Sequence, residues 1–268
     1  MPNILYETRR VEDAFVIEFA QPHRVLSTSY VNGGIETLDY VVNHQSVKPN
    51  DFTGLDEIIA MGRDQYHALY LDSLDIAPQR AALIGTAANM DTIAHHQLSF
   101  SSERQQAGHI NKNRPLIVDV WVSAGACRNA LRAGDPAKWY QAREGNKQID
   151  YGGTINSIIL INYPVTSGVL GKALMVATEA KSSVLQDLKV PSRQGDGVAT
   201  GTGTDQIAIA APVRESTDDF LLDSASGHLK LGELIGKTIR EATLQALINQ
   251  GQVIYADGQA RFQSDQKL

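Results

Sequence analysis

Residues 154–162, TINSIILIN, centre on the apolar run 158–161, which is typical of a buried β-strand, and the stretch stops before Pro164. A long helix is expected over residues 166–188, because apolar side chains recur there at three- and four-residue steps. The run 199–205, ATGTGTD, then leads into a second apolar strand that continues to about Ala210. This order of strand, helix, glycine-rich loop and strand is the framework from which the fold is predicted.

Strands precede this framework and a helix follows it. Asn32-Gly33-Gly34 is a strong turn signal, and residues 38–44 fit either a short strand or a first helical turn. Because strands come first and then mix with long helices without regular alternation, the sequence predicts one α+β domain over residues 1–268. Its sheet is expected to be mixed or mostly antiparallel and covered by long helices. The other expected elements are strands at 14–19, 24–29, 81–87 and 116–122, helices at 55–74 and 230–249, a turn at 21–23, a loop or exposed helix at 91–114, and a weak subdomain border at 144–147.

The composition is that of an ordinary globular protein, with 268 residues, 43% hydrophobic residues and a net charge of −6. There is no basic cluster, so no nucleic-acid partner is expected. Cys127 is the one cysteine, which excludes an intrachain disulfide and favours a reducing, cytoplasmic setting. The N-terminal residues lack a signal-peptide pattern, and no apolar run is long enough to predict a membrane partner. The sequence leaves open whether the protein forms a homo-oligomer.

The run 199–205 carries three threonines, two glycines and an aspartate beside exposed backbone. Such a loop suits a polar ligand or a reacting amide, although a flexible turn that enters a strand is an equally good interpretation. Gly201-Thr202-Gly203 is only a fragment of a dinucleotide fingerprint and precedes a strand instead of following one, which argues against a nucleotide site. Other well-known catalytic signatures are absent from the sequence.

Two histidines are the preferred acid, base or ligand candidates. His44 lies in a polar segment after an apolar strand, where a surface strand exit is the alternative. His228 opens the last helix, where the helix dipole disfavours the protonated ring and simple capping is the alternative. Glu179 lies in a small, apolar part of a helix, and a surface ion pair with Lys181 is the alternative. The remaining histidines are expected to be solvated or without supporting neighbours: His95 and His96 in the first group, and His23, His67 and His109 in the second.

Several polar and glycine-containing segments are spread along the chain in a definite order: Asn32-Gly33-Gly34, Asn43-His44-Gln45, residues 123–135, Gly153-Thr154-Ile155-Asn156, residues 177–181, residues 199–205 and residues 230–236. In their order and spacing these segments resemble the adenosylcobinamide amidohydrolase family over roughly residues 24–245. Two features depart from that pattern. Residues 91–114 are longer and more polar than the family leads us to expect, and Cys127 stands where a small residue is expected, which argues against a cysteine nucleophile.

The resemblance implies hydrolysis of the amide that joins aminopropanol to the corrin ring of adenosylcobinamide. This is a linear, non-peptide amide, and its cleavage would give adenosylcobyric acid for corrinoid salvage in coenzyme B12 synthesis. The corrinoid would then be a substrate. The sequence requires no cofactor, and it leaves open whether a divalent metal is used. The alternatives are a non-catalytic corrinoid-binding or trafficking protein and an amidase that acts on another amide.

Amide hydrolysis needs an activated nucleophile, an oxyanion stabiliser and a proton donor for the leaving amine. We expect Thr200 or Thr202 to bond the scissile amide, Asp205 or Glu179 to act as base, and His44 to act as general acid or base. A metal-dependent version would use His44, His228 and a carboxylate. The expected substrate-binding residues are Asn32, Gly33, Asn43, Thr154, Asn156, Thr200, Gly201, Gly203, Thr204 and His228.

Overall fold

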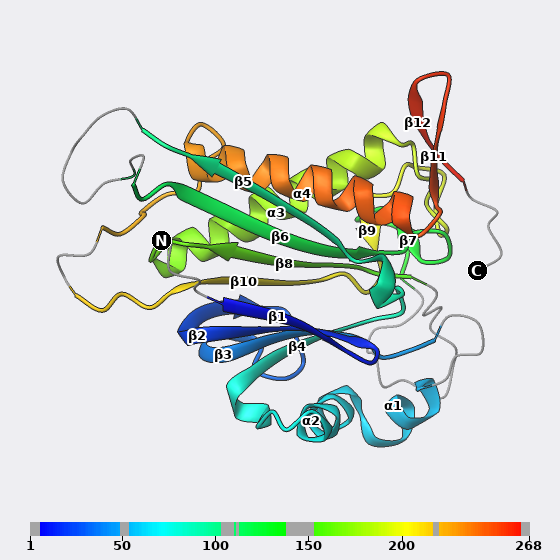
Figure 1. The fold of residues 1–268 in the computed structure, drawn as a ribbon. Helices are drawn as coiled ribbons and strands as arrows, with labels where there is room; N and C mark the ends of the chain where they lie inside the picture. Colours follow the sequence, from blue (N-terminus) through cyan, green and yellow to red (C-terminus); the bar gives the residue numbers. More distant parts are fainter. Residues whose placement is uncertain are drawn as a thin grey trace.

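The computed structural model describes residues 6–48, 54–102, 110, 113–137, 153–216 and 220–263. Its centre is an eight-stranded sheet with the order β4-β3-β2-β10-β8-β6-β5, in which β1 pairs with β2 beside this path (Figure 1). The β3/β4 and β8/β10 pairs are parallel and the other pairs are antiparallel, so the predicted mixed sheet is confirmed. The strands are β1 Tyr6–Val11, β2 Ala14–Ser27, β3 Gly34–Gln45, β4 Ala81–Thr86, β5 Ala94–Phe100, β6 Leu116–Ala124, β8 Ile155–Ile161 and β10 Gln206–Pro212.

Two long helices, α3 (Ser167–Asp187) and α4 (Lys230–Asn249), cover one face of β6, β8 and β10 (Figure 1). Thr166 caps α3 by accepting a hydrogen bond from the Val169 N–H, which fixes where the helix begins. Alternate residues of β10 divide between the two faces: Ile209 joins the core under these helices, and Ala208 joins the core on the opposite face. The predicted α+β fold with long covering helices is therefore confirmed.

The opposite face of the sheet closes on itself around aromatic side chains. Trp121 of β6 lies 5.7 Å from the Phe15 ring of β2 and 5.5 Å from the Tyr6 ring of β1, measured between ring centroids. Tyr6 also donates a hydrogen bond to the buried Asp119 carboxylate of β6. These contacts join strands that are not neighbours in the sheet, so the sheet is strongly curved.

Two shorter helices, α1 (Leu55–Met61) and α2 (Arg63–Ser73), lie beside β3 and β4 (Figure 1). Leu71 of α2 packs on β2, β3 and β4. The single helix predicted over 55–74 is wrong, because the chain breaks at Gly62, whose φ of 89° is outside the helical region. Residues 38–44, for which strand and helix were both open, belong to β3.

The turn predicted at residues 21–23 is also wrong. β2 runs through this segment as one strand, and the register against β3 shifts between Glu18 and His23. A bulge accommodates Pro22, since its missing N–H removes no regular ladder hydrogen bond there. The prediction of a loop or exposed helix at 91–114 is wrong for Ala94–Phe100, which form the edge strand β5 with polar outward side chains. The remaining strands are short: β7 Ala130–Leu131, β9 Gly201–Thr202, β11 Val253–Ala256 and β12 Gln259–Phe262.

Three sequence predictions fall wholly or partly outside the described residues: His109, the suggested border at 144–147, and part of 91–114. Among the helices that are described, none combines the length and the apolar character that crossing a membrane would require. Cys127 is buried, as expected of a structural thiol.

Candidate active site

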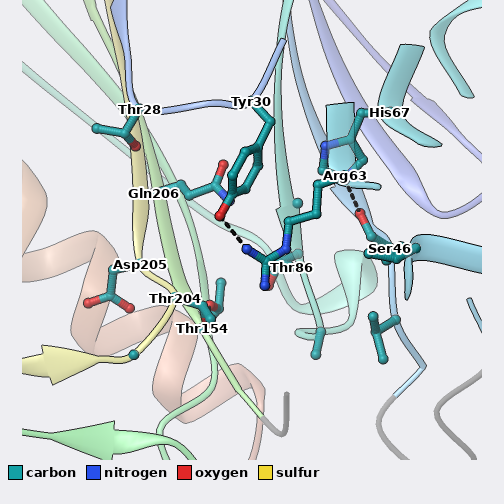
Figure 2. Close-up of a pocket in the computed structure, with 15 residues that line it drawn as sticks. Thr28, Tyr30, Ser46, Arg63, His67, Thr86, Thr154, Thr204, Asp205 and Gln206 are labelled. Carbon is teal, nitrogen blue, oxygen red and sulfur yellow. Dashed lines mark hydrogen bonds between the residues drawn. The ribbon is translucent and has the colours of Figure 1, made fainter. Parts of the chain in front are cut away.

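A cavity of about 370 Å³ opens at one end of the sheet, where β2, β3 and β4 end and β8 and β10 begin. Side chains from α1 and α2 contribute to its wall (Figure 2). The segment 203–206 meets the ends of β3 and β4 here, so loops far apart in the sequence share one site. The lining residues are Thr28, Tyr30, Ser46, Val47, Ile58, Arg63, His67, Gly85, Thr86, Ala87, Thr154, Gly203, Thr204, Asp205 and Gln206.

Asp205 fixes the glycine-threonine loop on one side of the cavity. Its carboxylate accepts hydrogen bonds from the Ile155 N–H at 2.9 Å, the Thr202 N–H at 3.0 Å and the Thr202 hydroxyl at 2.5 Å, and it forms an ion pair with Lys181 of α3. A Cβ atom at Gly201 would approach the Asp205 Oδ2 to 2.5 Å, which explains the glycine. With four donors around it, the Asp205 carboxylate holds the loop against β8 and α3.

Thr204 and Thr154 present paired hydroxyls beside this loop. Their Oγ1 atoms are hydrogen-bonded to each other, and the Asn129 Nδ2 donates to the Thr204 Oγ1 at 3.1 Å and to the Gly153 carbonyl at 3.0 Å. Figure 2 shows the two threonines together, on the side of the cavity that also holds Asp205. Such hydroxyls can donate to or accept from a bound amide.

Ser46 lies on the other side of the cavity, between two histidine rings. Its Oγ is 3.0 Å from the His44 Nδ1 and 3.1 Å from the His67 Nε2 (Figure 2 shows the second contact). His44 is in β3, and Ser46 follows the last residue of that strand, where the Ser46 N–H donates to the His44 carbonyl at 2.8 Å and turns the chain. His67 comes from α2. A Cβ at Gly85 would lie 2.8 Å from both the Ser46 Oγ and the His67 Nε2, so glycine leaves room for this contact.

Burial keeps both rings neutral at pH 7. It lowers the pKa of His44 to about 3, with a smaller contribution from the neighbouring His67. It also lowers the pKa of His67 to about 4, where the Arg63 charge acts in the same direction. The His44 ring stacks on Tyr70 at 3.4 Å between centroids, which holds its orientation. A neutral imidazole carries one N–H and one lone pair, so each ring can act as donor or acceptor toward Ser46.

Figure 2 shows the Tyr30 hydroxyl pointing toward the Arg63 guanidinium in the centre of the view. An Arg63 guanidinium N–H donates to the Tyr30 hydroxyl at 2.5 Å, and the guanidinium carbon lies 5.0 Å from the tyrosine ring centroid. Arg63 and Asp205 are the charged residues among those that line the cavity, and Asp205 is neutralised by Lys181. The cavity is therefore favourable for an oxygen that gains negative charge.

Four predicted site residues line this cavity: Thr154, Gly203, Thr204 and Asp205. Thr202 and Gly201 lie behind them as supports of Asp205. His44 is one hydrogen bond away from the cavity, through Ser46. Seven further predictions occupy other environments, which are described next.

Asn43 and Asn156 are fully buried beneath the cavity and connect strands. The Asn156 Nδ2 donates to the Asn43 Oδ1 at 3.1 Å and to the Gly85 carbonyl at 2.9 Å, and the Asn43 Nδ2 donates to the Ser123 Oγ at 2.9 Å. This amide network holds β3, β4, β6 and β8 in register. Asn32 donates to the carbonyls of Pro78 and Ala81, in a turn where neighbouring Gly33 leaves no room for a Cβ.

The last three predicted residues are not among the lining residues. Glu179 is exposed on α3, His228 is exposed just before α4, and the Thr200 Oγ1 accepts a hydrogen bond from the Ala133 N–H. The metal-dependent hypothesis needs His44, His228 and a carboxylate to converge. Across the residues that the structure describes, no group of three or more His, Cys, Asp or Glu side chains is placed to hold a metal ion.

Four residues of the cavity lining were not predicted as site residues: Ser46, His67, Arg63 and Tyr30. His67 was expected to lack supporting neighbours, and this is wrong, because its partners come from another element and not from adjacent sequence. The available signal was the short separation of two polar residues, His44 and Ser46, at the end of an apolar strand.

A protein-family model described as adenosylcobinamide amidohydrolase matches residues 3–254 of the chain. The uncharacterized protein MJ1613 of Methanocaldococcus jannaschii is 30% identical over 251 residues, which cover 89% of this chain and 87% of that protein. The residues that the family model matches include the segments that form the cavity.

The solved structures that are similar to this chain share less sequence identity with it. The PH0078 protein of Pyrococcus horikoshii has a TM-score of 0.44 at 12% identity, covering 93% of this chain and 81% of that one. The L-aminopeptidase D-Ala-esterase/amidase of Ochrobactrum anthropi has a TM-score of 0.39 at 11% identity, with coverages of 91% and 83%. A Burkholderia β-aminopeptidase has a TM-score of 0.40 at 14% identity, with coverages of 96% and 86%. These likenesses are too distant to bear on the chemistry of this chain.

Proposed function

Because this chain belongs to the adenosylcobinamide amidohydrolase family, we propose that it hydrolyses the amide that joins aminopropanol to the corrin ring of adenosylcobinamide. The products would be adenosylcobyric acid and 1-amino-2-propanol, and the reaction would serve corrinoid salvage for coenzyme B12 synthesis. The observation that carries the proposal within the structure is the cavity where Ser46 meets two neutral histidine rings.

The size of the cavity supports this substrate. A volume of about 370 Å³ can take the aminopropanol arm and its amide, whereas the corrin macrocycle is far larger and would stay at the mouth. The hydroxyls of Thr154 and Thr204 are placed to hydrogen-bond the inserted arm. The Arg63 guanidinium would favour the charge that develops on the amide oxygen.

The chemistry of the lining residues supports hydrolysis over simple storage. A buried neutral imidazole next to a hydroxyl is the usual means of moving a proton during acyl transfer. Both His67 and His44 meet this requirement, because each ring contacts the Ser46 hydroxyl. Of the two, His67 lines the cavity. Asp205, in contrast, is assigned to holding the loop, because Ile155, Thr202 and Lys181 together donate four hydrogen bonds to its carboxylate.

The proposal is tested by incubating the purified chain with adenosylcobinamide and quantifying 1-amino-2-propanol and the corrinoid acid by mass spectrometry. Equimolar release of both products, with repeated turnover, is expected. A parallel reaction with a chelator measures any dependence on a metal. A stable complex without release of the amine would instead identify a corrinoid-binding protein, and release from other amides in a small panel would identify a different amidase.

Gly85→Ala is expected to lower the hydrolysis rate at least about tenfold and to destabilise the protein by about 1–3 kcal/mol. The new methyl group would lie 2.8 Å from the Ser46 Oγ and the His67 Nε2, so the two side chains must separate. Gly171→Ala is the matched control, since a Cβ there meets nothing within 4 Å in helix α3. Thermal unfolding and the amine-release rate measure both effects. Equal rates for the two variants would show that the Ser46–His67 contact is not needed.

A further inference from the structure

We propose that Ser46 is the nucleophile of this reaction, and that the corrinoid acyl group is carried for part of the cycle as an ester on the Ser46 Oγ. The inference rests on the proposed function and adds to it the identity of the attacking atom. It starts from the position of Ser46, which lines the cavity with only 5% of its surface exposed. A hydroxyl so placed faces a bound arm and little bulk water.

Ser46 has the hydrogen-bond partners that a nucleophilic hydroxyl needs. It can donate its proton to one ring and accept an N–H from the other, because both rings are neutral and each carries one donor and one acceptor. Donation to a ring nitrogen increases electron density on Oγ, and acceptance from the second ring fixes the direction of the oxygen lone pairs. The two distances, 3.0 and 3.1 Å, lie within hydrogen-bonding range.

His67 is assigned as the general base and His44 as a positioning residue. His67 lines the cavity, so the proton that it takes from Ser46 can pass to the leaving amine. His44 is not among the lining residues and is held against Tyr70. In this assignment the His44 Nδ1–H donates to Oγ, and the Ser46 hydroxyl donates to the lone pair of the His67 Nε2. No described residue hydrogen-bonds the His67 Nδ1, so the tautomer of this ring is set by its contact with Ser46.

The other hydroxyls of the cavity lack a histidine partner. The Thr28 Oγ1 accepts from the Ile207 N–H at 3.0 Å, and the Thr86 Oγ1 accepts from the Ala88 N–H at 2.9 Å. Thr154 and Thr204 bond to each other. Among the described threonine and serine side chains of the cavity wall, Ser46 is the one hydrogen-bonded to imidazole nitrogens.

The reaction balances with water as the co-reactant. The Ser46 Oγ adds to the amide carbon while its proton moves to the His67 Nε2. The C–N bond then breaks, and His67 returns that proton to the leaving nitrogen, which departs as 1-amino-2-propanol. Water next adds to the ester carbon and gives a proton to His67. The C–Oγ bond breaks, the proton returns to Ser46, and the corrinoid leaves as its carboxylic acid.

The test compares the wild-type protein with Ser46→Ala and with Ser157→Ala, a buried serine of β8 that does not line the cavity. Ser46→Ala is expected to lower kcat by about 10³-fold or more while the corrinoid still binds, and Ser157→Ala to remain within a few-fold of wild type. A Ser46→Ala variant that folds and turns over at the wild-type rate would overturn the assignment.

A second measurement on the wild-type protein keeps the proposal testable even if Ser46→Ala fails to fold. Hydroxylamine added during turnover is expected to divert the ester to a corrinoid hydroxamate, and acid quenching is expected to leave the corrinoid on the peptide that contains Ser46. Amine release with neither hydroxamate nor labelled peptide would overturn Ser46 as nucleophile and leave the proposed hydrolysis intact. If the wild-type protein releases no amine, the proposed function and this inference fail together.

Discussion

Asp205→Ala is expected to lower the free energy of unfolding by about 3 kcal/mol, the lower end of the cost of removing one partner from a buried ion pair, because this pair is partly buried. Asp205 and Lys181 expose only 15% and 13% of their side chains, so water can replace little of the lost interaction. The substitution also removes the acceptor of the Ile155 and Thr202 N–H groups. Chemical denaturation followed by circular dichroism measures the effect.

Asp187→Ala is the matched control for this experiment. Asp187 also pairs with a basic residue, Arg240, but its side chain is 63% exposed, so its loss is expected to cost less than about 1 kcal/mol. Adding Lys181→Met to Asp205→Ala should recover part of the stability, because it removes the unpaired ammonium group. A loss below about 1 kcal/mol for Asp205→Ala would contradict the role of this carboxylate as the anchor of the loop.

Acid is expected to destabilise the protein through the two histidines beside Ser46. Their pKa values are lowered to about 3 and about 4 in the folded state and lie near 6.5 in the unfolded chain. Below about pH 6.5 the unfolded chain therefore binds protons that the folded protein does not, so stability falls as the pH falls toward 4. For His67 alone the loss reaches about 3 kcal/mol when the shift is fully expressed, of which about 2 kcal/mol falls between pH 7 and pH 5.

The variant His67→Gln isolates this contribution. Glutamine keeps hydrogen-bonding groups near Ser46 but does not titrate, so the variant should lose less stability than wild type between pH 7 and pH 5. The charged and titratable groups that act on the two rings, Arg63, Asp64, Tyr66 and Tyr70, remain unchanged in this comparison. Denaturant midpoints at the two pH values give the result. Parallel losses in both proteins would mean that the buried ring does not resist protonation.

The elements that the sequence predicted best are those with strong local patterns. The helices α3 and α4 follow uninterrupted apolar stripes, and β8 and β10 are short apolar runs between clear breaks. The incorrect predictions are at positions where the structural context of a single residue determines the backbone conformation. Gly62 divides a well-patterned helix because of its φ angle, and Pro22 lies in a bulge of β2 that no local pattern distinguishes from a turn.

The candidate site was predictable only on the side that one loop supplies. The sequence predicts Thr204 and Asp205 as site residues because polar residues and glycines alternate in the loop 199–205. The histidine side is assembled from β3, β4 and α2, and the meeting of Ser46 with His67 depends on how α2 packs over the sheet. Sequence spacing carries no information about that packing. Glu179 and His228 had favourable sequence contexts, but both are exposed and away from the lining of the cavity.

If the Ser46–His67 contact in this cavity performs the cleavage, His67→Gln will slow the chemical step itself. The measurement is the rate of 1-amino-2-propanol release from adenosylcobinamide in a single turnover, with protein in excess, for wild type and His67→Gln at pH 7. A rate at least about 10²-fold lower is expected for the variant, the usual contribution of a general base, with corrinoid binding retained. Equal release rates in two folded proteins that bind the corrinoid equally would rule out this role of His67.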